Sequence, residues 1–131
     1  MSATFHDLHG VSVFISGGGA GIGADLTDAF MAQGAKVAFI QRSDASDFCD
    51  AMEKKHGMRP HFQACDITDI DALKGAIASA ADAHGDIGVL VNNAANDTRH
   101  TLEEYGPAEW DASMAVNLRH HFFAAQAVVA G

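Results

Sequence analysis

A glycine-rich loop that directly follows a short apolar run constrains this chain more than any other feature. The apolar run is Val11–Ile15, and the loop Ser16–Gly23 reads SGGGAGIG. Glycine adopts positive φ angles and has no Cβ to keep a ligand away from its amide. A helix that begins here would add unpaired N–H groups and a partial positive charge. The arrangement is typical of a binding site for a diphosphate.

The sequence after the loop supports this interpretation. Apolar residues at helical spacing predict a helix over Asp25–Gln33 that ends at Gly34, and Lys36–Ile40 is a second apolar run of strand length. Strand, glycine loop, helix and strand within about 30 residues form the βαβ unit of dinucleotide-binding folds. No Gly-Lys-Ser/Thr follows the loop, which argues against a site for a nucleoside triphosphate. The alternative is a loop that uses glycine for turn geometry alone.

Helices and strands continue to alternate along the rest of the chain. Thr68 is the expected N-cap of a helix, with Asp71 three residues later, and Pro107 suits the first turn of a last helix that reaches the end of the chain. The other expected elements are a helix Ser43–Gly57, a strand Arg59–Ala64, a helix Thr68–His84 and a strand Ile87–Val91. This order predicts an α/β fold, a doubly wound parallel sheet with helices on both faces. We expect residues 1–131 to form one Rossmann domain that is incomplete at its C-terminus.

Composition limits the classes of function. The chain has 131 residues, 48% of them hydrophobic and 19% charged, which suits one domain with a core. No apolar run is long enough to span a bilayer, and no secretory signal is visible. A net charge of −9 argues against a nucleic-acid partner. Two widely separated cysteines are typical of a reducing cytoplasm, with a disulfide as the alternative, and the histidines show no metal-ligand set, so we predict no metal.

Four motifs in order resemble those of the short-chain dehydrogenases/reductases. They are Ser16-Gly17-x-x-x-Gly21-Ile22-Gly23, Asp66 after the third strand, Asn92-Asn93-Ala94-Ala95 after the fourth, and Asn117 within Ala115-Val116-Asn117-Leu118. Ser16 replaces the family's usual threonine, and Ala95 its usual glycine. The resemblance implies an NAD(P)-dependent oxidoreductase that transfers hydride between the cofactor and an alcohol or carbonyl compound. The segment Asn96-Asp97-x-Arg99-His100 is similar in particular to bacterial aldose 1-dehydrogenases, which implies a sugar substrate.

The resemblance assigns cofactor-binding roles along the chain. The glycines would form the close turn at the pyrophosphate, the backbone around Ile22 would contact phosphate, and Asp66 with Ile67 would hold the adenine ring. The alternative for Asp66 is an ordinary helix or turn starter, and the asparagine at the end of the fourth strand is also a frequent turn former. The cofactor-binding residues implied are Gly17, Gly19, Gly21, Ile22, Gly23, Gln41, Arg42, Asp66, Ile67, Asn93, Ala94 and Ala95.

Gln41 and Arg42 bear on the choice between NAD and NADP. Members that prefer NAD carry an acid at the end of the second strand for the ribose 2′-hydroxyl, and Gln41 stands there instead. Arg42 could pair with a 2′-phosphate, which favours NADP. Asp44 could neutralise Arg42, and an arginine without a role is the alternative.

The resemblance implies one catalytic residue, Asn117, and three candidate substrate-binding residues. In the family, the asparagine at Asn117 disturbs its helix and holds a water in a proton relay, whereas a tolerated helical asparagine is the alternative. Asn96, Arg99 and His100 could face the hydroxyl groups of a sugar, or they could belong to a solvated loop.

The family's acid–base residues are not found in this sequence. They are a serine, a tyrosine and a lysine four residues after the tyrosine, but Tyr105 is followed at that spacing by Glu109 and precedes Gly106-Pro107. We therefore expect the cofactor-binding part of a longer enzyme, inactive alone. A non-catalytic dinucleotide-binding module and another Rossmann-type enzyme, such as a methyltransferase, are the alternatives. An open sheet edge at the fourth strand and an uncovered last helix predict self-association, as in a homo-oligomer.

Overall fold

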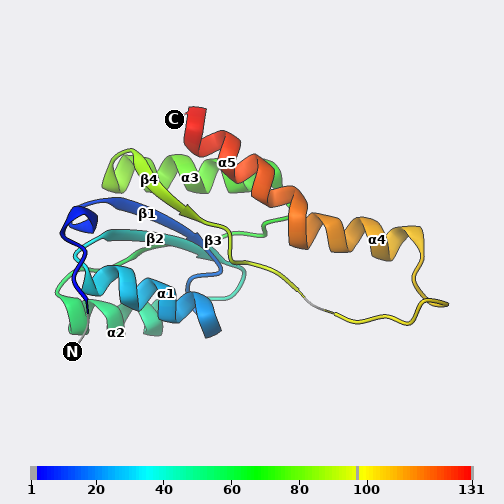
Figure 1. Cartoon of the computed structure of the whole chain (residues 1–131), viewed down its shortest axis with the longest axis horizontal. Helices are drawn as coiled ribbons and strands as arrows, with labels where there is room; N and C mark the ends of the chain where they lie inside the picture. The colour runs from blue at the N-terminus through cyan, green and yellow to red at the C-terminus, as the bar shows by residue number, and fades with distance from the viewer. Residues whose placement is uncertain (1–2, 97, 131) are drawn as a thin grey trace.

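The computed structural model describes residues 3–96 and 98–130, which form one parallel sheet with helices on both faces (Figure 1). The sheet has the order β3-β2-β1-β4, so the chain builds outward from β1 in one direction and then crosses to its other side. This is the doubly wound arrangement predicted from the alternating elements. The strands are β1 (Ser12–Ser16), β2 (Lys36–Gln41), β3 (His61–Ala64) and β4 (Ile87–Val91).

Helices α1 and α2 cover one face of the sheet, and α3 and α5 lie on the other (Figure 1). The helical segments are η1 (His6–Leu8), α1 (Gly21–Ala32), α2 (Ser46–His56), α3 (Ile70–His84), α4 (Pro107–Met114), the π-helical turn η2 (Ala115–Arg119) and α5 (His120–Ala130). None of the helices described is long and apolar enough to cross a lipid bilayer.

Alternate side chains of the central strands pack into two separate hydrophobic clusters, one on each face of the sheet. Val13 and Ile15 pack with Met31 of α1 and Met52 of α2, whereas Phe14 packs with α3 and α5. Every residue of β1 is buried, because a parallel strand in mid-sheet has helices on both sides. The apolar run of β4 also pairs in parallel, but β4 is the sheet edge and its residues are partly buried or exposed.

Several predicted boundaries differ from the structure for local reasons. Helix α1 begins at Gly21, four residues before the predicted Asp25, because Gly21 and Gly23 form its first turn. Strand β3 begins at His61 rather than Arg59, since Pro60 has no N–H to donate. Arg59 instead pairs with Asp50 at 2.6 Å.

Two helix starts also need correction. The expected N-cap Thr68 does not cap α3: the carboxylate of Asp69 accepts from the amide of Ala72 at 3.0 Å, and α3 begins at Ile70. Helix α2 begins at Ser46 rather than Ser43. The predicted last helix does begin at Pro107, but it divides into α4, η2 and α5.

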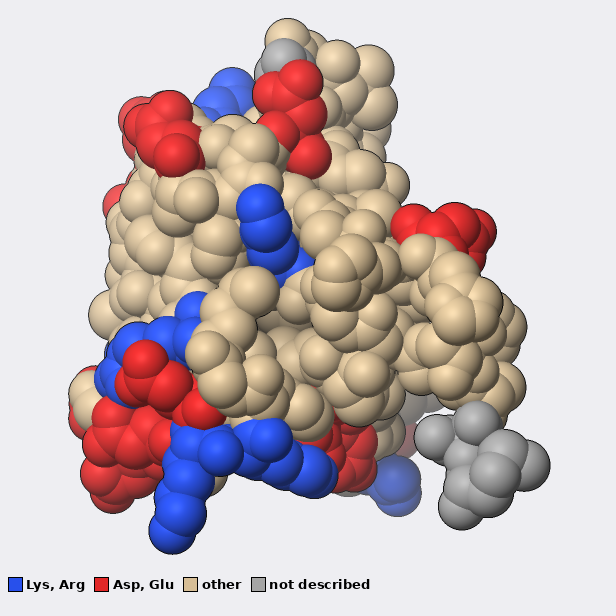
Figure 2. Space-filling view, turned by 90° about the vertical axis from the view of Figure 1, so that its left-hand side faces the viewer, with Lys and Arg blue, Asp and Glu red and all other residues tan. Residues whose placement is uncertain are grey.

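Charged side chains are mixed on the face at the amino ends of the strands. In Figure 2, the basic and acidic side chains on this face are interspersed, and much of the remaining surface belongs to residues other than Lys, Arg, Asp and Glu. The carboxyl ends of the strands point the other way (Figure 1), and that edge carries the main cavity described below.

Candidate dinucleotide site

The glycine loop joins β1 to α1 in a conformation that other residues would not tolerate. Gly17 has φ +75° and Gly21 has φ +54°. A Cβ at Gly23 would overlap the carbonyl oxygen of Gly17, and one at Gly19 would overlap the amide oxygen of Gln41. The glycines therefore let the first turn of α1 lie against the end of β1. Ile22 in that turn is 74% exposed.

A buried threonine of α1, which was not among the residues predicted for the site, holds this loop. The Thr27 hydroxyl donates to the carbonyl oxygen of Gly18 at 2.7 Å. Thr27 is fully buried, and a buried hydroxyl needs a partner. The sequence offers one signal for this role: Thr27 is a polar residue on the buried face of the helix, together with Gly23 and Met31.

A pocket of about 590 Å³ opens at the carboxyl ends of the four strands. It brings together nine residues predicted from the sequence: Gly17, Gln41, Arg42, Asp66, Ile67, Asn93, Ala94, Ala95 and Asn96. Six more were not predicted: Ala20, Ile40, Ser43, Cys65, Thr68 and Val116. Gly19, Gly21, Ile22, Gly23 and Asn117 are not among the lining residues, although the glycines shape the loop beside it.

Gln41 and Arg42 differ in how they are held at the rim of the pocket. The Gln41 amide donates to the carbonyl and hydroxyl oxygens of Ser43 at 3.1 and 3.2 Å. Arg42 is exposed. Asp44, which could have neutralised it, accepts a hydrogen bond from the Ser46 hydroxyl at 2.7 Å. Among the residues described, Arg42 and Asp44 form no ion pair.

Asp66 is both a turn former and a pocket residue. Its Oδ1 accepts from the amide and the hydroxyl of Thr68, at 2.9 and 2.7 Å. These two bonds hold the pKa of the Asp66 carboxyl below its usual value, and the Arg42 charge lowers it further. Asp66 is therefore ionised at neutral pH. Asp66 therefore forms the turn after β3 and also lines the pocket.

The segment after β4 is fixed to the end of β1. The Ser16 hydroxyl accepts from the amides of Asn93 and Ala94, both at 3.0 Å. The Asn93 side chain donates to the carbonyl oxygen of Gly17 at 3.1 Å. In the sequence, Ser16 stands out only as a replacement for threonine, but its hydroxyl joins the two strand ends.

Asn117 joins the same segment to the last helix. Its Oδ1 accepts from the Asn96 amide at 2.8 Å, and its Nδ2 donates to the Asn96 carbonyl at 2.9 Å and to the Ser113 hydroxyl at 3.2 Å. Asn117 lies in the π-helical turn η2, so the predicted disturbance of the helix is present. Such turns occur frequently at functional sites.

Two of the three predicted sugar-binding residues line one cavity, and the third does not. Asn96 and His100 line a second cavity of about 230 Å³, together with Asn117 and Glu109. It shares Asn96 and Val116 with the larger pocket. Arg99 is exposed and lines neither cavity. Asp97, part of the same motif, lies outside the described residues.

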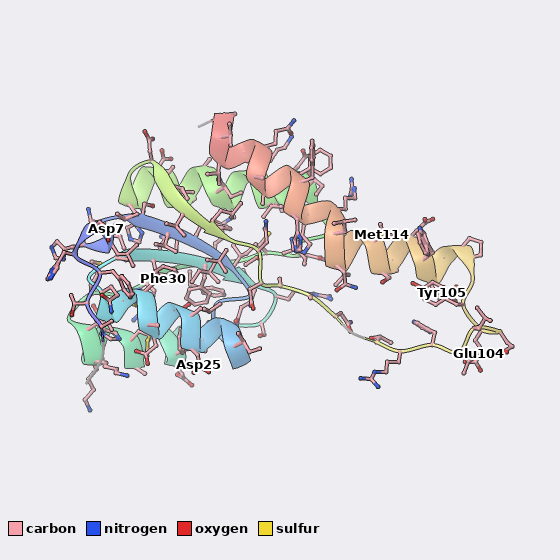
Figure 3. All side chains as sticks on the ribbon, in the orientation of Figure 1. Asp7, Asp25, Phe30, Glu104, Tyr105 and Met114 are labelled. Atoms are coloured by element: carbon pink, nitrogen blue, oxygen red, sulfur yellow. The ribbon has the colours of Figure 1, made fainter. Side chains whose placement is uncertain are left out.

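Tyr105 does not belong to the pocket. Figure 3 shows it beside α4, at the end of the molecule away from the sheet. Its ring lies 5.1 Å from that of His100 and 6.4 Å from that of Trp110, between ring centroids. Within the part of the chain described, no group of three or more His, Cys, Asp or Glu residues could hold a metal ion.

Comparisons with known proteins agree with this geometry. A probable galactose dehydrogenase of Rhizobium meliloti is 43% identical over 129 residues, which are 97% of this chain and 50% of that protein. A D-xylose 1-dehydrogenase of Caulobacter vibrioides is also 43% identical, over 99% of this chain and 51% of that protein. A blue fluorescent protein from a metagenomic library, solved in complex with NADPH, is 30% identical with a TM-score of 0.86, over 95% of this chain and 52% of that one.

The chain spans about half the length of the curated relatives it matches. A family model described as short chain dehydrogenase matches residues 12–131. The match includes the glycine loop, the residues of the pocket and the π-helical turn. The chain belongs to the short-chain dehydrogenase family.

Proposed function

We propose that the pocket binds NAD(P), with NADP preferred, as part of an oxidoreductase that acts on the alcohol or carbonyl group of a sugar. One observation carries the proposal: the glycine loop and all four strand ends open into one pocket of about 590 Å³. Ligands of open α/β sheets bind outside the carboxyl ends of the strands, where the strand order reverses. Here that point lies between β1 and β4.

The residues present fit a dinucleotide. The first turn of α1 lies close to the loop because Gly23 has no Cβ, and its amides would face the diphosphate. Asp66 and Ile67 would hold the adenine, and residues 93–95 the nicotinamide ribose. Bound there, the nicotinamide would accept or supply a hydride. A water that serves a proton relay would be held by the backbone of the η2 turn, since both polar atoms of the Asn117 side chain bond elsewhere.

The preference for NADP is supported by charge at the rim. Arg42 lines the pocket and is exposed, while Gln41 brings no negative charge to repel a 2′-phosphate. We expect R42A to raise the Kd for NADPH about tenfold and to leave that for NADH unchanged. Fluorescence titration of both cofactors measures this, with NADH as the internal control. Equal losses for the two cofactors would contradict the preference.

A sugar substrate is supported by the relatives named galactose and xylose dehydrogenases. The second cavity offers polar groups from Asn96, His100 and Glu109 beside the larger pocket. We expect an enzyme that contains this chain and the rest of its coding sequence to reduce NADP with an aldose such as D-galactose or D-xylose. Absence of turnover with every aldose, but turnover with another alcohol, would place the substrate elsewhere.

A non-catalytic dinucleotide-binding module is the second candidate. It is favoured by Tyr105, which lies away from the pocket and is followed by Glu109 where a lysine would be required. Reading the coding sequence downstream of codon 131 separates the two candidates. A Tyr-x-x-x-Lys motif supports the enzyme, and a stop codon supports the module. In either case we expect the 131-residue chain alone to show no hydride transfer.

We also propose that the protein self-associates in the cytoplasm. Leu118, Phe122 and Val129 are large apolar side chains exposed on η2 and α5. The two cysteines are free and buried, as in proteins of reducing compartments. The molecular mass of the purified chain in solution, measured by light scattering, tests the association, and the mass of a stable monomer would contradict it.

A further inference from the structure

Buried polar side chains mark the places where the fold has a specific polar partner to satisfy. Among the residues described, four polar side chains are buried: Ser12, Ser16, Thr27 and His120. Three of them bond to the backbone of loops around the pocket: Ser16 to residues 93 and 94, Thr27 to Gly18, and His120 to Ala94. His120 is the one of these three that can titrate near neutral pH.

His120 is the first residue of α5 and its side chain is fully buried (0% exposed). Its Nε2 lies 3.0 Å from the carbonyl oxygen of Ala94. A carbonyl oxygen only accepts, so Nε2 must carry the proton. The amide of Ala94 donates to Ser16. Ala94 is therefore held from β1 through its N–H and from α5 through its C=O.

The surroundings keep this imidazole uncharged. Burial lowers the pKa of His120, and the neighbouring His121 lowers it further. The carbonyl oxygens of Val116 and Ala94 act in the opposite direction, but by less. The His121 ring meets the His120 ring edge-on, with 4.4 Å between centroids. The lowered pKa favours the neutral ring at neutral pH, and the contact with the Ala94 carbonyl places its proton on Nε2. Nδ1 is then buried with no hydrogen-bond partner among the described residues.

We infer that His120 is a positioning residue for the pocket, which donates from Nε2 to Ala94 and holds residues 93–96 in the shape that receives the nicotinamide side of the cofactor. The inference rests on the proposed function of the pocket. Asn117 holds the far end of this segment through Asn96, whereas His120 holds the end that lines the pocket next to β1. Loss of the His120 bond would let Ala94 move while the sheet remains intact.

Two amide variants separate this role from simple filling of space. In H120Q the side-chain amide reaches about as far as Nε2, whereas in H120N it reaches only about as far as Nδ1. We expect H120N to raise the Kd for NADPH about fivefold or more, and H120Q to stay within about twofold of the wild type. The control is H84N, because His84 is another histidine whose pKa is lowered by burial, yet it does not line the pocket. H84N should bind NADPH like the wild type.

Nitrogen-15 NMR of histidine-labelled wild-type chain gives a readout independent of the cofactor. We expect His120 to be protonated at Nε2 and unprotonated at Nδ1 at neutral pH. The inference is overturned if Nε2 carries no proton, or if H120N binds NADPH as tightly as the wild type. If H120N does not fold, the affinity of H120Q and the NMR spectrum decide. If the wild-type chain binds neither NADPH nor NADH, the proposed function itself fails, and that outcome is distinct from equal binding by H120N.

Discussion

The two ends of the sheet are built differently, although both contribute to one pocket. The inner region comprises β1 and β2 with α1, α2 and α3, and every residue of β1 is buried. The outer region comprises β4, α4, η2 and α5, where no residue of β4 is fully buried and Phe122 is 65% exposed. Figure 1 shows α4 extending past the end of the sheet.

The difference lies in what holds each region in place. Apolar packing on both faces of the sheet stabilises the inner region. Residues 93–96, which directly follow β4, are held by individual hydrogen bonds from Ser16, Asn117 and His120. Each of those bonds contributes about 1 kcal/mol, against about 2 kcal/mol or more for one large buried apolar side chain. The outer part of the pocket should therefore be the easier part to disturb.

The largest expected effect compares one apolar residue from each region. Leu73 of α3 is 0% exposed and packs in the cluster beneath β1, so L73A should lower the free energy of unfolding by about 2–5 kcal/mol. In the monomer, F122A removes an exposed ring and should change the free energy of unfolding by less than about 0.5 kcal/mol. Urea denaturation measures both variants, in protein dilute enough for light scattering to show a monomer. A large loss for F122A in the monomer would show that this ring packs within the chain, which would remove the contrast between the regions.

The next effect concerns the glycine loop of the inner region. G23A places a Cβ against the carbonyl oxygen of Gly17, and backbone cannot move aside cheaply. We expect a loss of about 1–3 kcal/mol in stability together with loss of cofactor binding. G75A is the matched control in helix α3, where an added Cβ meets nothing within 4 Å. It should stabilise the chain by about 0.5–1 kcal/mol, since alanine favours helix. Equal behaviour of the two variants would mean that α1 does not approach the loop closely.

A smaller effect is expected at the hydrogen bonds of the outer region. N117A removes both bonds to the Asn96 backbone, so the Asn96 amide should exchange with solvent faster while the global stability falls by only about 1 kcal/mol. N117D keeps the acceptor for that amide and should preserve its protection. Unchanged exchange in N117A would show that packing, not Asn117, holds the segment.

The inner region could be predicted from sequence because its signals are local. The apolar runs, the glycine spacing and the polar residues at strand ends placed the sheet, the loop and nine of the pocket residues. Ser16 and His120 were missed because their partners lie 78 and 26 residues away in the chain, and no local pattern records such contacts. Thr27 bonds to a residue only nine positions away, and its one local signal was a polar residue on an apolar helix face. The Thr68 prediction failed for a related reason. More than one side chain near a helix start can accept from its first amides, and here Asp69 does so, while the Thr68 hydroxyl donates to Asp66.

The smallest expected effect is a pH dependence to which each region contributes one histidine. Burial lowers the pKa of His84 in α3 and of His120 in α5 below 6.5, with further lowering from His61 and Lys36 at His84 and from His121 at His120. Below about pH 6.5 these histidines bind protons more readily in the unfolded chain than in the folded chain. The stability that the two neutral histidines contribute is therefore complete above about pH 6.5 and falls as the pH drops below it. The Asp28 carboxyl, whose pKa is lowered by Lys55 and His56, loses its contribution only as the pH falls below about 3.8, so it does not interfere. We expect H84L and H120Q each to make the loss of unfolding free energy between pH 7 and pH 5.5 smaller, by less than about 1 kcal/mol. If only H84L did so, water would reach His120, and the outer region would be open at a place where its interior is polar.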